Sequence, residues 1–117
     1  MRIGISAYNI APRDLVALAR DAEAAGFSGV WLGEHVIAPR GYTTAHPRSD
    51  AAIQQHAVPV AHESMVLADP LTTLAAAGQH TRDIDLATGI YVAPLRHPLA
   101  IARAVCTVQD LCEGRFV

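Results

Sequence analysis

Residues 29–35 read GVWLGEH. Bulky apolar side chains, which are typical of a buried strand, run into Gly33 and then directly into a carboxylate and an imidazole, Glu34 and His35. Polar groups that follow a buried strand without a spacer are typical of the strand carboxyl ends where α/β proteins build active sites. The stretch therefore predicts a strand over residues 29–32 that delivers two candidate functional residues.

Short β-rich segments recur on both sides of this stretch. Residues 2–8 and residues 84–92 read as further strands, and residues 115–117 read as the first residues of a fourth. Because these segments are mostly apolar and carry no strict alternation, they are expected to be covered on both faces, as in a parallel sheet.

Amphipathic helices are expected between these strands. Proline suits the first turn of a helix, and glycine suits the left-handed conformation that ends one. Together with apolar residues spaced by three and four positions, these signals predict helices from Pro12 to Gly26, from Pro70 after Asp69 as N-cap, and from Pro98 to Gly114.

The predicted order is β-α-β-loop-α-β-α-β, which favours parallel strands joined by right-handed crossovers. A doubly wound nucleotide-binding fold expects G-x-G-x-x-G after its first strand, whereas residues 6–14 read SAYNIAPRD. We therefore predict the α/β class and a partial (β/α)8 TIM barrel of three βα units plus the start of a fourth strand. A whole barrel takes roughly 250 residues, so a chain of 117 residues supplies less than half.

The helical and strand periodicity fails over residues 36–68, which contain three prolines. We predict a long loop insertion there, within a single domain that spans residues 1–117. The loop holds imidazoles and carboxylates whose spacing matches no common ligand motif, so no metal site is predicted. These residues are His46, Asp50, His56, His62 and Glu63.

Composition limits the classes of partner. The formal net charge is −2, and the nine basic residues form no run, so neither nucleic acid nor an anionic membrane is expected. Without a span of ~18 to 20 apolar residues or a signal-peptide h-region, the chain is expected to be cytoplasmic. Cys106 and Cys112 lie six positions apart in one predicted helix, on different faces, and are not expected to form a disulfide.

Two groups of residues at the predicted strand ends could carry chemistry. His35 could donate a hydrogen bond to a bound ring or transfer a proton, and Glu34 could fix its tautomer or anchor the loop. Thr88, Gly89 and Ile90 lie where a flat cofactor could rest against bare backbone. The alternative for Gly89 is a glycine that relieves crowding inside the barrel.

A third candidate follows the predicted strand over residues 84–92. Arg96 precedes a helix N-terminus, whose unpaired N–H groups favour anions. We predict that Arg96 contacts a phosphate or ribityl chain, with a solvated arginine as the alternative.

Three stretches together resemble the amino-terminal portion of the bacterial-luciferase-like oxidoreductases. They are MRIGIS (residues 1–6), LARDAEAAGFSGVWLGEHV (18–36), and the run from DPLTTLAAAGQH to CEGRFV (69–117). The resemblance implies a (β/α)8 barrel, usually dimeric, that uses FMN or the deazaflavin coenzyme F420. It further implies that His35 lies beside the cofactor ring, that Thr88 to Ile90 back the ring, and that Gly89–Ile90 is a non-prolyl cis peptide.

The leading hypothesis is an oxidoreductase that acts on a small molecule, or the amino-terminal part of one. It would be a luciferase-like monooxygenase or an F420-dependent hydride-transfer enzyme, forming a homo-oligomer or completed by another chain. Two other readings stay open: a non-catalytic remnant that acts as an assembly module, and a metal-dependent sugar-isomerase-type barrel fragment in which Glu34 ligates the ion.

Overall fold

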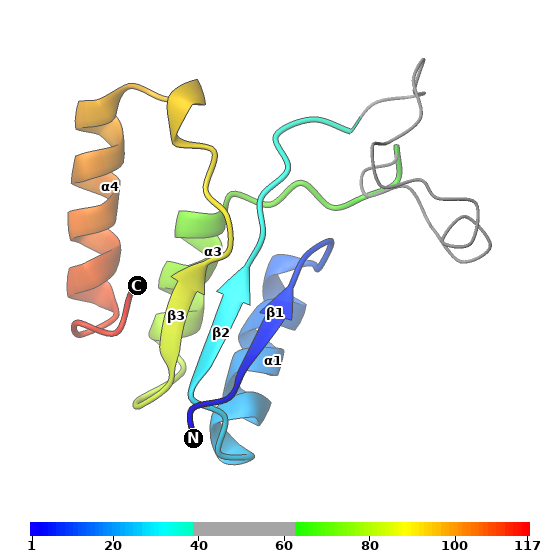
Figure 1. Ribbon diagram of the computed structural model, residues 1–117, viewed down its shortest axis with the longest axis vertical. Coiled ribbons are helices and arrows are strands. Elements are labelled where there is room, and N and C mark those ends of the chain that lie inside the picture. The colour runs from blue at the N-terminus through cyan, green and yellow to red at the C-terminus, as the bar shows by residue number, and fades with distance from the viewer. Residues whose placement is uncertain (39–62) are drawn as a thin grey trace.

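The computed structural model describes residues 1–38 and 63–117, and its centre is a sheet of three parallel strands. The strands are β1 (Gly4–Ala7), β2 (Gly29–Leu32) and β3 (Asp85–Thr88), and they lie in the order β1-β2-β3 (Figure 1). Their register is level, since Ala7 pairs with Leu32 and Leu32 with Thr88. The predicted α/β class and the parallel sheet are confirmed.

Helices α1 (Pro12–Ala24) and α3 (Pro70–Gly78) pack together against one face of this sheet, and α4 (Pro98–Leu111) lies beside α3 (Figure 1). A short 3₁₀ helix, η1 (Ala93–Leu95), precedes α4. The core forms where apolar side chains of the helices meet those of the strands. Its fully buried members include Leu15, Ala19, Val30, Leu74, Ala77 and Leu86.

The predicted helix boundaries hold for physical reasons that the structure shows. The Asp69 carboxylate accepts a hydrogen bond from the backbone N–H of Thr72 at 2.9 Å, which caps α3. Gly26 and Gly114, which follow α1 and α4, have φ of +82° and +84°, a conformation that favours glycine.

Strand β3 is shorter than predicted, because it ends at Thr88 rather than at residue 92. The Gly89 N–H donates to the carbonyl of Leu32 at 2.9 Å, and Leu32 is the last residue of β2. Beyond this point the ladder has no partner strand, and the Val92 N–H donates instead to the side chain of Glu34 at 2.7 Å. Beyond Gly89, a side-chain acceptor therefore takes the place of a partner strand at Val92.

On the face of the sheet away from the helices, three glycines surround the indole of Trp31. A Cβ atom at Gly29 would lie 2.6 Å from Cη2 of Trp31, and one at Gly4 would overlap the same ring. A Cβ at Gly89 would lie 3.2 Å from Cβ of Trp31. The bare backbone at these positions makes room for Trp31.

The amino-terminal end of the sheet is held by a carboxylate. Glu23 Oε1 accepts the backbone N–H groups of Arg82, Asp83 and Ile84 at 2.8, 2.7 and 3.0 Å. Burial raises the pKa of Glu23, but these three donors and the charge of Arg115 outweigh it, so the pKa lies below its ordinary value. The last turn of α1 is thereby fastened to the segment that enters β3.

Residues 115–117 run beside β3, as predicted for the start of a fourth strand. Phe116 forms a parallel bridge with Leu86, whose N–H donates to the Arg115 carbonyl and whose carbonyl accepts from the Val117 N–H. The Arg115 guanidinium donates to the carbonyl of Gly78 at 3.0 Å and so satisfies the end of α3.

The predicted insertion at 36–68 is described only at its two ends. Residues 36–38 and 63–68 contain no helix or strand, and His46, Asp50, His56 and His62 lie outside the described residues. Cys106 and Cys112 are both free thiols, as predicted. Within residues 1–38 and 63–117, no helix combines the length and apolar character that crossing a membrane requires.

Candidate active site

The level register of the sheet brings the predicted site residues to one end of it. Leu32 pairs with Thr88, so the residues that follow each of them leave the sheet at the same carboxyl edge. A Cβ built at Gly33 would lie 3.8 Å from the carbonyl oxygen of Gly89, which shows how close the two exits are. The two strand ends therefore meet at one edge of the sheet.

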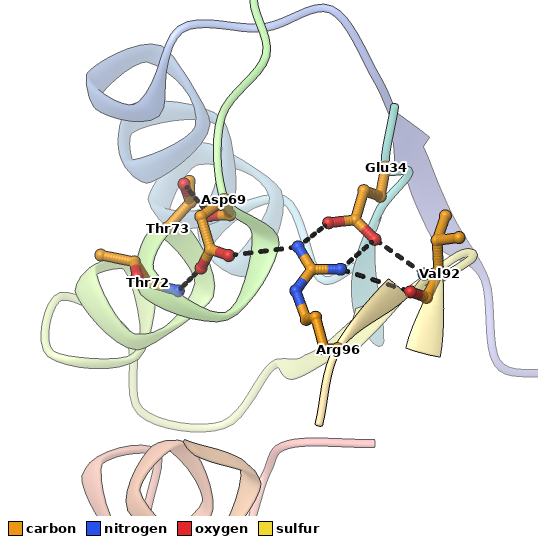
Figure 2. Close-up of polar contacts among 6 residues, drawn as sticks. All are labelled: Glu34, Asp69, Thr72, Thr73, Val92 and Arg96. Carbon is orange, nitrogen blue, oxygen red and sulfur yellow. Dashed lines mark hydrogen bonds and ion pairs between the residues drawn. The ribbon is translucent and has the colours of Figure 1, made fainter. Parts of the chain in front are cut away.

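Glu34 and Arg96 form an ion pair across this edge (Figure 2). Arg96 Nη2 donates to Glu34 Oε1, and Nη1 donates to Oε2 at 3.1 Å, so the contact is bidentate. Glu34 Oε2 also accepts the Val92 N–H at 2.7 Å. The Glu34 side chain is 2% exposed and the Arg96 side chain 27%, so the carboxylate is buried behind the guanidinium.

Arg96 has further partners that lie on different elements. Its Nη1 lies 3.4 Å from the Val92 carbonyl, and its Nη2 lies 3.6 Å from Oδ2 of Asp69. The guanidinium carbon lies 4.4 Å from the ring centroid of Tyr91, a cation–π distance. Hydrogen bonding to Glu34 outweighs partial burial and raises the pKa of Arg96 above its ordinary value.

His35 lies beside the segment that leads into α3. It lines a narrow cavity of about 10 Å³, about the room of one water, together with Asn9 and Val66. The Asn9 side chain accepts the Val66 N–H at 2.8 Å, which ties the end of β1 to that segment. Neither Gly89 nor Ile90 lines this cavity.

Thr88, Gly89 and Ile90 present backbone and an apolar side chain to solvent. Gly89 is exposed and the Ile90 side chain is 74% exposed. The structure contains no cis peptide among its described residues, so the cis Gly89–Ile90 bond implied by the resemblance is wrong. The contact of Gly89 with Trp31 supports the reading that this glycine relieves crowding.

The structure therefore joins some predicted residues and separates others. Glu34 and Arg96, predicted as a catalytic group and a cofactor ligand, contact each other directly. His35 lines a cavity to which neither Glu34 nor Arg96 contributes.

Sequence reasoning missed Tyr91 as the ring that stacks on Arg96. It identified Asp69 only as a helix cap, although its second oxygen faces Arg96 (Figure 2). A carboxylate and an arginine at two neighbouring strand ends were the available signal for the pair.

A metal-ligating role for Glu34 is unfavourable in this geometry. Both carboxylate oxygens accept hydrogen bonds from the Arg96 cation, which would repel a divalent ion at the same place. Among the residues the structure describes, no group of three or more His, Cys, Asp or Glu side chains could hold a metal ion.

A comparison with known protein families gives a match that covers the parallel sheet and its carboxyl edge. The model of the family described as luciferase-like monooxygenase matches residues 2–117. The chain belongs to this family. The match extends over every strand and helix that the structure describes in this luciferase-like chain, and the resemblance drawn from its sequence is confirmed.

Several relatives of this luciferase-like chain carry named activities. The F420-dependent glucose-6-phosphate dehydrogenase of Beutenbergia cavernae is 33% identical over 118 residues, which is 98% of this chain and 29% of that protein. The crystal structure of monooxygenase RslO1 from Streptomyces bottropensis superposes with a TM-score of 0.69 at 25% identity, covering 99% of this chain and 31% of that one.

A third comparison is with an FMN complex. The oxygenating constituent of 3,6-diketocamphane monooxygenase from Pseudomonas putida, solved with FMN, gives a TM-score of 0.66 at 20% identity over 99% of this chain and 28% of that one. At that identity the similarity shows the fold alone, and it agrees with a partial barrel. The luciferase-like chain thus spans about a third or less of the length of these proteins.

Proposed function

We propose that this chain is the amino-terminal part of an oxidoreductase that uses coenzyme F420 or FMN to transform a small molecule. The observation that carries the proposal is the pairing of Leu32 with Thr88, which brings His35 and the bare backbone at Gly89 to one edge of a parallel sheet. Active sites of barrels with this topology form at that edge.

The proposed ring site lies on Thr88, Gly89 and Ile90. An exposed glycine next to a largely exposed isoleucine offers a flat surface with little steric obstruction, which suits an aromatic ring system. When bound, such a cofactor supplies two-electron redox chemistry, while the protein supplies binding and orientation. In this proposal His35 donates a hydrogen bond or a proton at the edge of the site.

The fit of the present residues to a phosphate or ribityl chain is weaker. Arg96 was the predicted contact, but its guanidinium is already bound to Glu34 and stacked on Tyr91. We therefore assign the anionic part of the cofactor to no residue of this chain.

Coenzyme F420 is the preferred cofactor and hydride transfer the preferred reaction. The relative that is 33% identical over 98% of this chain is named an F420-dependent dehydrogenase. FMN with monooxygenation is the alternative, and it draws support from the 25% identical monooxygenase. The substrate is proposed to be a small molecule, and the enzyme to be an oligomer.

Trp31 supplies a direct test, because it is the single tryptophan of the chain and packs against Gly89. Oxidised F420 and FMN would each be titrated into the purified chain while ring absorbance and Trp31 fluorescence are followed. A ring on Gly89 is expected to quench Trp31 and to shift its own absorbance with the same saturation curve. Absence of both signals for both cofactors would overturn the proposal.

A matched pair of histidine variants tests the proposed role of His35. His35→Ala removes the imidazole at the carboxyl edge, whereas His80→Ala removes an exposed imidazole that follows α3 at the other end. Cofactor binding is expected to weaken about tenfold in His35→Ala and to stay unchanged in His80→Ala. Equal behaviour of the two variants would contradict the assignment.

A further inference from the structure

We propose that Glu34 and Arg96 act as a positioning pair for the candidate site, and not as a catalytic group and an anion-binding group. The inference rests on the proposed function for its consequence, which is the orientation of His35 and of the ring-backing segment. Its structural content concerns the two strand ends alone and can be tested without any cofactor.

Glu34 is a buried carboxylate whose two oxygens are both bonded within the protein. Its oxygens accept two hydrogen bonds from the Arg96 guanidinium and one from the Val92 N–H, and the side chain is 2% exposed. A carboxylate that is buried and bonded in this way acts through the residues it binds.

The pair joins three segments that are distant in the sequence (Figure 2). Glu34 follows β2, Val92 and Arg96 belong to the turn after β3, and Asp69 begins α3. Because a guanidinium is planar and donates along fixed directions, a bidentate contact sets orientation as well as distance. The pair therefore fixes how the turn after β3 sits against the end of β2.

The proposed functional groups lie close to this pair along the chain. His35 is covalently next to Glu34, and Gly89 lies three residues before Val92, whose N–H binds Glu34. Rotation of the Glu34 side chain away from Val92 would free the backbone next to His35 and the backbone that follows Gly89 at the same time. Partial release of a preorganised site is costly, since a misplacement of about 1 Å can lower activity by about a hundredfold.

Amide hydrogen exchange tests the structural content. The variants compared with the wild type are Glu34→Gln and Arg96→Gln. In Glu34→Gln, faster exchange of the Val92 N–H is expected in any case, because Glu34 accepts that N–H directly. The decisive amides are those of Gly33 and Gly89, which donate to the carbonyls of Ala7 and Leu32. We expect these two to exchange about tenfold faster or more than in the wild type, since loss of a buried charged contact disturbs its surroundings.

Glu23→Gln is the matched control. It also removes a carboxylate that accepts backbone N–H groups, but at the opposite end of the sheet. Faster exchange is expected there at Arg82, Asp83 and Ile84 and not at Gly33 or Gly89. If Glu34→Gln leaves Gly33 and Gly89 unchanged, or if Glu23→Gln alters them equally, the positioning role is overturned.

Two further variants keep the test decisive if Glu34→Gln folds poorly. Arg96→Lys keeps the positive charge but loses the planar guanidinium. This variant is therefore expected to fold, while its Gly89 amide still exchanges faster than in the wild type. The double variant Glu34→Gln/Arg96→Gln removes both charges, and the Gly33 and Gly89 amides are expected to exchange as fast in it as in Glu34→Gln alone, because either single change already breaks the contact between the two side chains. Wild-type exchange at Gly89 in Arg96→Lys would show that orientation is not what the pair supplies.

A cofactor titration separates this inference from the proposed function. If the wild type binds F420 or FMN, Glu34→Gln is expected to weaken binding about tenfold or more and to change the absorbance of the bound ring, with Glu23→Gln unchanged. If the wild type binds neither, the proposed function fails, and the exchange of Gly33 and Gly89 still decides whether the pair positions the strand ends.

Discussion

The six-membered ring of Trp31 occupies the space in which a Cβ atom at Gly4 would lie. The two residues stand on neighbouring strands, and the indole extends from β2 across the face of β1. The face of the sheet opposite the helices therefore depends on a size match between one large and several absent side chains.

Gly4→Ala is expected to destabilise the protein by about 1–3 kcal/mol, because the added methyl group forces the indole to move. Gly33→Ala is the matched control, since its Cβ would meet nothing closer than 3.5 Å, an ordinary contact. Urea unfolding followed by Trp31 fluorescence gives both free energies of unfolding. Equal stability of the two variants would contradict this size match.

Gly78→Ala reverses the usual preference of helices for alanine. Alanine is ordinarily favoured over glycine within a helix by about 1 kcal/mol, but here its Cβ would overlap Sγ of Cys112, which packs from the end of α4. We expect a loss of about 1–3 kcal/mol in the free energy of unfolding.

The overlap between positions 78 and 112 also predicts non-additive energetics. Cys112→Ala alone is expected to cost about 1 kcal/mol through the cavity it leaves, whereas in the double variant the two changes offset each other in part. A double-mutant cycle in chemical denaturation measures this coupling. Simple addition of the two single effects would show that the helices separate easily.

The Glu23 carboxylate makes stability depend on pH. Its pKa in the folded state lies below the ordinary value of 4.5, so its contribution is present above that value and is lost as the pH falls through the folded pKa. Glu23→Gln is expected to cost about 2 kcal/mol at neutral pH, through weakened bonds to three N–H groups. Urea unfolding of both proteins from neutral to acidic pH should show the difference shrink; a difference that is constant with pH would exclude the carboxylate as its cause.

The two cysteines are expected to react at very different rates. Cys112 is 0% exposed, and burial raises the pKa of its thiol, an effect that the charge of Arg115 only partly offsets. Cys106 is exposed. A colorimetric thiol reagent should therefore label one thiol per chain in the folded state and two in denaturant, while Cys106→Ser should lose the fast reaction. Two fast thiols in the folded chain would show that the contact between α3 and α4 opens readily.

The sequence was sufficient to predict the elements that depend on local signals. Pro12, Pro70 and Pro98 begin helices, and glycines with positive φ follow α1 and α4, because these preferences belong to the residue itself. The strand at 29–32 was predicted with its observed ends. The parallel order followed from the alternation of strands and helices.

Features that depend on contacts between distant residues were not accessible. The segment after β3 is held by the Glu34 side chain, 58 positions from the Val92 N–H that it binds. The role of Arg96 was predicted from its place before a helix, but its actual partner lies 62 positions away. Local patterns identify which residues carry charge, and only the packed chain shows which charges are already paired.

Arg115 binds the carboxyl end of α3, a helix that precedes it in the chain. Its guanidinium satisfies the carbonyl of Gly78, which lies 37 positions earlier, and Phe116 then lies along β3. A growing polypeptide leaves the ribosome amino end first, so α3 emerges before the side chain that binds the Gly78 carbonyl has been made. The contacts that complete this part of the molecule are therefore expected to form together once residues 115–117 have been made, rather than one βα unit at a time.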